Sequence, residues 1–178
     1  YLTILLPEIT KEEWRKHFCE ATLLPVDEFK RRMMIMGNPK ELSKSLEIIS
    51  AIDSESISTA VLNSSIAKAK IQIVGYDYCN DVEGVFKKYF NCEKPFGKKG
   101  KEFPDAFVLS ALEQYAKKNH IENIILLSQD SDMIDYKSDV LTPKEIGKYL
   151  DGILKEIAER SEAEKRDIEK LYAYFHKG

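Results

Sequence analysis

The sequence lacks the features that mark several protein classes. Its apolar runs are far shorter than the ~20 residues that a membrane-spanning helix needs. Glycine and proline fill only 8 and 6 of the 178 positions, which excludes collagen-like and low-complexity chains. With 27 basic and 30 acidic residues, the net charge of −3 produces no overall positive field toward nucleic acid or anionic lipid. Any site for a polyanion therefore has to be local.

Cysteine and histidine are also scarce. The three cysteines form no Cys-x-x-Cys or Cys/His metal pattern, which is typical of reduced thiols in a cytoplasmic protein. The three histidines have no ligand or triad spacing, and no serine lies in a Gly-x-Ser-x-Gly segment. Histidine-based and serine-nucleophile hydrolysis therefore have no support, and we expect a cytoplasmic protein without a membrane segment.

What the sequence does contain is an alternation of strand-like and helix-like segments. Strands are predicted at residues 2–6, 71–74 and 123–127. Helices are predicted at residues 10–20, 26–36, 40–70 with a break near Asp53-Ser54, 82–89, 105–119, 142–160 and 161–175. The run Ile124-Ile-Leu-Leu127 does not alternate with polar residues, which indicates a strand covered on both faces, as in parallel sheets flanked by helices. The pattern predicts an α/β fold.

Carboxylates gather where such a fold places its ligands. Asp130 and Asp132 follow the buried strand, at the sheet edge where open α/β sheets have their crevices. Asp105 lies in the first turn of its helix, where it is either a structural cap or a group facing that crevice. Glu13, on the helix after the first strand, either faces the same crevice or is a solvated residue on the helix surface. Unpaired carboxylates repel one another unless hard divalent cations neutralise them, so oxygen-only ligation would favour magnesium or manganese.

A local positive segment lies close by in the sequence. Between Lys87 and Glu102 there are six lysines and two acidic residues, a balance of +4. Such lysines can hold phosphates beside a metal site, and Phe96 and Phe103 offer apolar or base-stacking surface. An ordinary hydrated loop with two packed aromatic rings explains the segment equally well.

These segments resemble the PIN domain nucleases, in particular a bacterial subgroup with a lysine-rich loop before a Phe-Pro-Asp-Ala helix. The resemblance is carried by Pro95-Phe-Gly97, by residues 101–106 (Lys-Glu-Phe-Pro-Asp-Ala) and by residues 126–132 (Leu-Leu-Ser-Gln-Asp-Ser-Asp). Leu5-Leu-Pro-Glu-Ile9 followed by Glu13 is similar to the family's early strand and acidic helix. The resemblance to the family spans roughly residues 2–149 and is loose over residues 25–70.

The resemblance implies a three-layer α/β/α PIN-like fold, with a small central parallel sheet and extra C-terminal helices. It places the nuclease domain at residues 1–150 and a helical extension at residues 151–178. It also implies an endonuclease, usually acting on RNA, with Mg²⁺ or Mn²⁺ held by acidic residues. The implied roles are metal binding and catalysis for Glu13, Asp105, Asp130 and Asp132, and phosphate binding for Lys98, Lys99 and Lys101. An antitoxin or other regulatory protein is a possible partner, and an oligomer is possible.

One ligand of the family pattern is not in this sequence: an Asp at the end of an initial strand. We expect that strand to precede Tyr1, because a sheet without its middle strand would leave edges and apolar side chains uncovered. The alternative is an inactive domain of the same fold that binds nucleic acid or a protein. A second rival is a doubly wound phosphoryl-transfer domain that uses Asp130 and Asp132 on a small phosphate ester.

Overall fold

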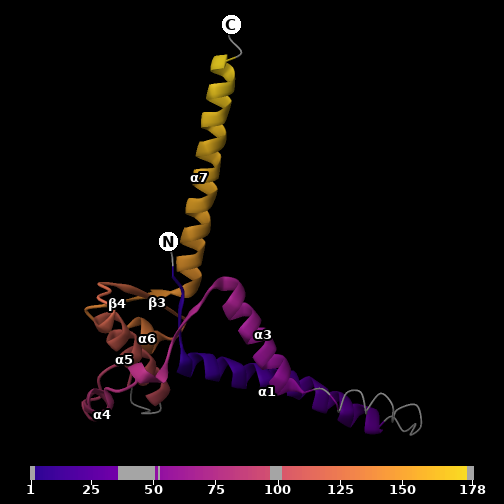
Figure 1. The fold of residues 1–178 in the computed structure, drawn as a ribbon. Helices are drawn as coiled ribbons and strands as arrows, with labels where there is room; N and C mark the ends of the chain where they lie inside the picture. Colours follow the sequence, from indigo (N-terminus) through magenta and orange to yellow (C-terminus); the bar gives the residue numbers. More distant parts are fainter. Residues whose placement is uncertain (1–2, 36–50, 52, 97–101, 176–178) are drawn as a thin grey trace. The chain divides into compact units, whose positions relative to one another are not determined.

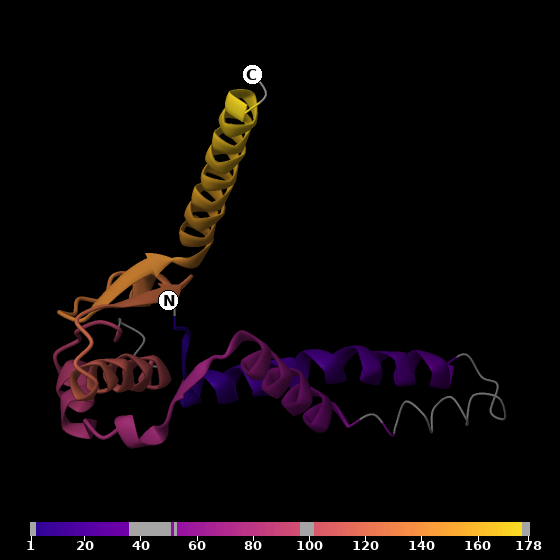
Figure 2. The ribbon, with the colours of Figure 1, turned by 45° about the horizontal axis from the view of Figure 1, so that its top comes forward.

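The computed structural model describes residues 3–35, 51, 53–96 and 102–175. The chain divides into two compact units: unit 1 comprises residues 1–82 and 107–115, and unit 2 comprises residues 83–106 and 116–178. Helix α5 (Phe103–Lys118) therefore has its middle in unit 1 and both of its ends in unit 2. Figures 1 and 2 show the elements along the chain.

In its described residues, unit 1 packs helices α1 and α3 with a two-stranded parallel sheet. Strand β1 (Leu5–Pro7) leads directly into helix α1 (Glu8–Ile35), and helix α3 (Ser54–Ala69) leads into strand β2 (Gln72–Val74) and the 3₁₀ helix η1 (Tyr76–Tyr78). The two strands pair in parallel, with Leu6 opposite Ile73. Helices α1 and α3 lie side by side in both views (Figures 1 and 2). Leu62 of α3 and Val74 of β2 are buried in the core.

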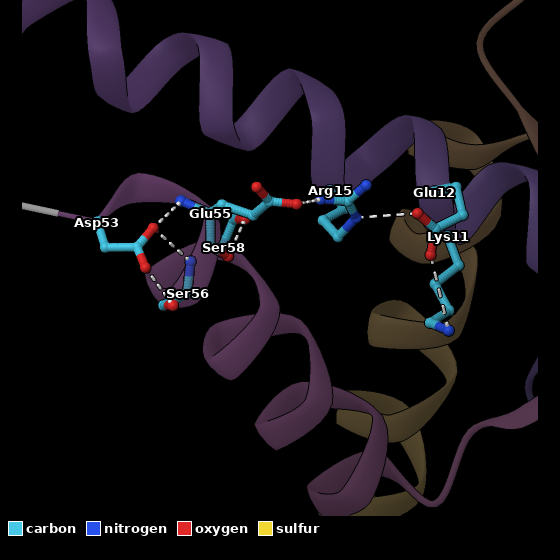
Figure 3. Close-up of polar contacts among 7 residues, drawn as sticks. All are labelled: Lys11, Glu12, Arg15, Asp53, Glu55, Ser56 and Ser58. Atoms are coloured by element: carbon cyan, nitrogen blue, oxygen red, sulfur yellow. Dashed lines mark hydrogen bonds and ion pairs between the residues drawn. The ribbon is translucent and has the colours of Figure 1, made fainter.

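An ion-pair chain joins α1 to α3 at their exposed edge (Figure 3). Arg15 donates from Nε to Glu12 at 2.9 Å and from Nη1 to Glu55 of α3 at 2.8 Å. These carboxylates, Glu12 first, raise the pKa of the Arg15 guanidinium. Exposed ion pairs add little free energy. These ion pairs therefore contribute more to the alignment of the two helices than to their stability.

Asp53 sets the start of α3. Its carboxylate accepts hydrogen bonds from the backbone N–H groups of Glu55 and Ser56, both at 3.1 Å, and from the Ser56 hydroxyl (Figure 3). These bonds satisfy helix N–H groups that have no partner within the helix. The predicted break near Asp53-Ser54 is therefore confirmed as a helix N-cap. The predicted helical residues before it, from Lys40, lie outside the described residues.

This cap predicts a pH-dependent contribution to stability. The Ser56 hydroxyl, followed by the backbone N–H groups, lowers the pKa of the Asp53 carboxyl below its ordinary value. A lowered folded-state pKa means that the contribution is complete above the ordinary pKa and is lost as pH falls through the folded value. We expect Asp53→Ala to lower the thermal midpoint at neutral pH, and the difference from wild type to shrink in acid. Thermal unfolding across the acid range measures this, and a difference that grows in acid would contradict it.

Unit 2 contains the second parallel pair. Its remaining elements are α4 (Val82–Phe90), β3 (Ile124–Ser128), α6 (Ser131–Ile134), β4 (Leu141–Glu145) and α7 (Ile146–Phe175). Strands β3 and β4 pair in parallel along their full length, from Ile124 opposite Leu141 to Ser128 opposite Glu145. Helix α7 contacts both strands, and Figure 1 shows this contact at its N-terminal end. The buried side chains of unit 2 include Val85, Phe96, Leu126, Tyr136 and Leu141.

Helices α3, α4 and α5 all end in the same way, with a non-glycine residue in the left-handed region. Lys70, Cys92 and His120 have φ values of 51°, 54° and 55°. After α5, His120 N–H donates to the Lys117 carbonyl and Ile121 N–H donates to the Ala116 carbonyl. This pair of bonds is the Schellman motif, in which glycine is the favoured residue. The motif turns the chain from α5 toward β3.

Substituting glycine at the end of α5 should therefore stabilise the protein. The left-handed conformation costs an L-residue about 1–2 kcal/mol, and glycine loses part of that gain to its greater unfolded entropy. We expect His120→Gly to raise the free energy of unfolding by about 0.5–1 kcal/mol. Urea unfolding with His120→Ala as the control, which keeps the strained backbone, measures the effect. Equal stability of the two variants would contradict the interpretation.

Two of the predicted helix boundaries are wrong. The helices expected at residues 10–20 and 26–36 are one helix, α1, which continues through Pro25. Proline disfavours a helix interior, but no glycine or second break signal accompanies it here. Likewise, the helices expected at residues 142–160 and 161–175 are one helix, α7, which begins only at Ile146. The predicted domain division at residue 150 falls within α7, and that boundary stays a prediction.

Thr142-Pro143, predicted as a helix start, lies in strand β4 instead. Pro143 is opposite Leu126 of β3, and the Thr142 hydroxyl donates to the Asn123 side-chain oxygen at 2.6 Å. Among the described residues β4 pairs only with β3, so it is an edge strand, where a missing N–H is tolerated. The Thr-Pro pair is thus compatible with an edge strand as well as with a helix start.

The α/β class with short parallel strands is confirmed, although the strands are arranged differently from the prediction. In the described part of the chain they form two separate pairs, β1 with β2 and β3 with β4, where one small sheet was expected. The two-sided covering expected for Ile124-Ile-Leu-Leu127 is also wrong in this structure. Leu126 is 9% exposed, whereas Ile125 and Leu127 are 40% and 37% exposed. A pair of strands has too few neighbours to bury both of its faces.

Cys19, Cys79 and Cys92 are free thiols, as predicted. Within the described residues, no helix combines the length and apolar character needed to cross a membrane.

Candidate functional site

The turn after β3 holds two of the predicted acidic residues. β3 ends at Ser128, and Asp130 is the N-cap of α6. The Asp130 carboxylate accepts a hydrogen bond from the Asp132 N–H at 2.7 Å, and the Asp130 N–H donates to Ser128 Oγ at 3.0 Å. Because β3 and β4 are parallel, this turn lies at the edge where α/β sheets place ligands. The predicted position is confirmed, and Asp130 also has a structural role there.

Asp132 forms an ion pair that the sequence analysis missed. Lys94, from the segment after α4, donates from Nζ to Asp132 Oδ1. The two side chains are 41% and 32% exposed, so the pair is only partly screened by water. The hydrogen bond to Asp132, with the negative charges of Asp132, Asp135 and Asp130, raises the pKa of Lys94 against the opposing effect of desolvation. A lysine therefore supplies the positive charge at this acidic turn.

Asp105 lies in the first turn of α5, as predicted, and is half-buried. The helix begins with a hydrogen bond from the Ala106 N–H to the Glu102 carbonyl at 2.9 Å. Pro104 is the second residue of the helix, where its missing N–H costs nothing because the first four N–H groups of a helix have no partner within it. The Phe-Pro-Asp-Ala sequence thus places one carboxylate at the positive end of the α5 dipole.

The predicted carboxylates are divided between the two units. Nowhere in the described part of the chain do three His, Cys, Asp or Glu side chains come together in a group able to hold a metal ion. Asp105, Asp130 and Asp132 are all in unit 2, while Glu13 is a half-buried residue of α1 in unit 1. The donor chemistry suits a hard divalent cation, but Asp130 caps α6 and Asp132 holds Lys94. The residue types fit such a cation, and Asp130 and Asp132 each have a second, structural contact.

The predicted phosphate-binding lysines, Lys98, Lys99 and Lys101, lie outside the described residues. Of the lysines around them in sequence, Lys88 is half-buried, with its Nζ 4.8 Å from the centre of the Tyr136 ring and hydrogen-bonded to the Tyr136 hydroxyl. Lys87 is exposed and pairs with Glu83 at 2.7 Å.

The aromatic surface differs from the one predicted. Phe96 is 2% exposed and packs edge-on against Tyr89 and Phe103, so it offers no face for stacking. Near it, Phe86 and Phe90 of α4 are exposed instead, at 42% and 75%. Their spacing of four residues on one helix face was a usable signal in the sequence.

Residues 1–133 match a family model described as the PIN domain. No curated protein and no solved structure matches the chain. The matched segment covers most of the 178 residues and includes Glu13, Asp105, Asp130 and Asp132. It ends one residue after Asp132, before β4 and α7. The chain belongs to the PIN domain family.

Proposed function

We propose that this chain is a metal-dependent endoribonuclease. The PIN domain is a nuclease-type fold whose members generally are nucleases and typically use divalent metals. The observation that carries the proposal is the position of Asp130 and Asp132 at the carboxyl end of β3, inside the segment that matches the family. Asp105, at the start of α5, supplies a third carboxylate in the same unit.

In this proposal the carboxylates bind metal and the lysines bind phosphate. Asp105, Asp130, Asp132 and Glu13 would hold Mg²⁺ or Mn²⁺, which supplies a Lewis acid for the phosphate and lowers the pKa of bound water. Lys98, Lys99 and Lys101 would bind flanking phosphates and so position the strand. In the hydrolysis, a water oxygen forms the new bond to phosphorus and gives up one proton, the bond to the leaving ribose oxygen breaks, and that oxygen takes up a proton.

A cleavage assay with the full chain tests the proposal. A single-stranded RNA with a fluorophore and a quencher is mixed with the protein, and Mn²⁺ or Mg²⁺ is titrated against an EDTA blank. We expect fragments only with metal, and no turnover of a generic phosphomonoester, which the phosphoryl-transfer rival requires. Fragments that form without metal, or the absence of fragments at every metal concentration, would count against a metal-dependent nuclease.

A second candidate is a domain of the same fold that binds RNA or protein without cleaving. The Lys94–Asp132 ion pair favours it, because a lysine already balances one of the proposed metal ligands. This candidate predicts RNA binding in EDTA and no fragments when Mn²⁺ is added. The expected cytoplasmic location, the regulatory partner and the oligomer stay predictions from the sequence.

A further inference from the structure

Five aromatic rings of unit 2 form one continuous cluster. Tyr89, Phe96 and Phe103 make up its inner part, with ring centres 4.9–5.3 Å apart. The outer part is Phe86, which lies 5.4 Å from Phe103, and Phe90, which lies 5.3 Å from Tyr89. The two outer rings are 6.2 Å apart, centre to centre.

The outer rings are held in place and open to solvent. Phe86 contacts Phe103 and Phe90 contacts Tyr89, so each exposed ring rests on a ring of the inner cluster. With exposed fractions of 42% and 75%, they present far more apolar surface than a core helix leaves in water. Exposed apolar patches of this kind mark binding surfaces. Rings fixed before binding lose little entropy when a partner arrives.

The part of the sequence that carries Phe90, Phe96 and Phe103 has an excess of positive charge, which favours a polyanion as the partner. Lys87 of α4 is exposed and pairs with Glu83 of the same helix at 2.7 Å. From Lys87 to Glu102 the sequence has six lysines and two acidic residues, in a chain whose net charge is −3. An apolar protein partner would need no such excess, whereas single-stranded nucleic acid combines stackable bases with phosphates.

We infer that Phe86 and Phe90 form a stacking platform for unpaired bases of single-stranded RNA. The inference rests on the proposed function for its choice of RNA, and it adds how the substrate is held and why it has to be unpaired. Stacking tolerates any base because every base has a π face, so the platform accepts all bases, with only a modest preference for those that stack more strongly. It acts by binding alone, apart from the carboxylates.

Fluorescence anisotropy in EDTA tests the inference, because no metal is present to support cleavage. The probes are labelled oligo(A) and oligo(U) of about 12 nucleotides and a duplex of the same length. We expect the full chain to bind oligo(A) more tightly than oligo(U), since purines stack better, and the duplex most weakly. Phe90→Ala should raise the dissociation constant for oligo(A) by about tenfold. Phe90→Trp should restore binding, and Phe90→Leu should not.

Controls separate stacking from other causes. Leu154→Ala removes a side chain that is 64% exposed on α7 of the same unit and should bind like wild type. Unchanged thermal midpoints show that the Phe90 variants fold. Three results would contradict the stacking platform. One is wild-type affinity for oligo(A) in Phe90→Ala, and another is no RNA binding by the wild-type chain. The third is wild-type affinity in Phe90→Leu, which would indicate a general apolar surface for a protein. If Phe90→Ala leaves Mn²⁺-dependent cleavage intact, only the stacking platform is contradicted. If RNA binding depends on Phe90 but no cleavage occurs, only the nuclease proposal is contradicted.

Discussion

Replacing Asp130 by Asn is expected to reduce metal-dependent RNA cleavage by at least about 100-fold, since even groups that only support a metal ligand cost 10–100-fold when removed. Asn is as good a helix N-cap as Asp. The variant therefore keeps the hydrogen bond from the Asp132 N–H that starts α6 and removes only the negative charge. The same expectation applies to Asp105→Asn at the start of α5. Initial cleavage rates at saturating Mn²⁺ measure both.

A second N-cap aspartate provides the matched control. Asp53 accepts the same kind of backbone hydrogen bonds at the start of α3 and is not among the proposed ligands. Asp53→Asn should therefore cleave RNA at the wild-type rate. Cleavage by Asp130→Asn and Asp105→Asn at that same rate would mean that the carboxylates only cap helices, or that the activity comes from a contaminant.

The local signals in the sequence were enough to place the acidic residues. Asp130 and Asp132 follow β3, and Asp105 opens α5, because strand runs and helix caps depend on neighbouring residues. The break at Asp53 was read correctly for the same reason. The helix end predicted before Pro25 and the helix start predicted at Thr142-Pro143 were wrong. Proline is compatible with more than one context, here a helix interior in α1 and an edge strand in β4.

Contacts between distant residues were not predictable in this way. Lys94 and Asp132 are 38 residues apart, and the sequence offers several lysines close to Lys94 that are equally suitable partners. Which phenylalanines become exposed also depends on packing: Phe96 fills the inner aromatic cluster, while Phe86 and Phe90 form its surface. Both features depend on tertiary packing, which neighbouring residues in the sequence do not determine.

Removing the Lys94 charge is expected to make the acidic turn a better cation site. In Lys94→Gln, Asp132 loses its internal counter-ion, so a divalent cation no longer has to displace an ammonium group. Because the pair is partly exposed, we expect only about a two- to fivefold decrease in the Mn²⁺ concentration needed for half-saturation. Electron paramagnetic resonance of free Mn²⁺ measures binding directly, without reference to activity. Lys94→Arg, which keeps the charge, should bind Mn²⁺ like wild type.

A change of pH does not substitute for this variant. The raised pKa of Lys94 means that the ion pair is complete below the ordinary lysine pKa and is lost only as pH rises through a still higher value. At neutral pH the ammonium group therefore stays charged, and Asp132 is released only if a competing cation displaces Lys94. Mn²⁺ binding by Lys94→Gln that is unchanged or weaker than wild type would show that Lys94 does not compete for this carboxylate. Tighter Mn²⁺ binding with a lower cleavage rate would instead mean that Lys94, once displaced, contacts the RNA phosphate.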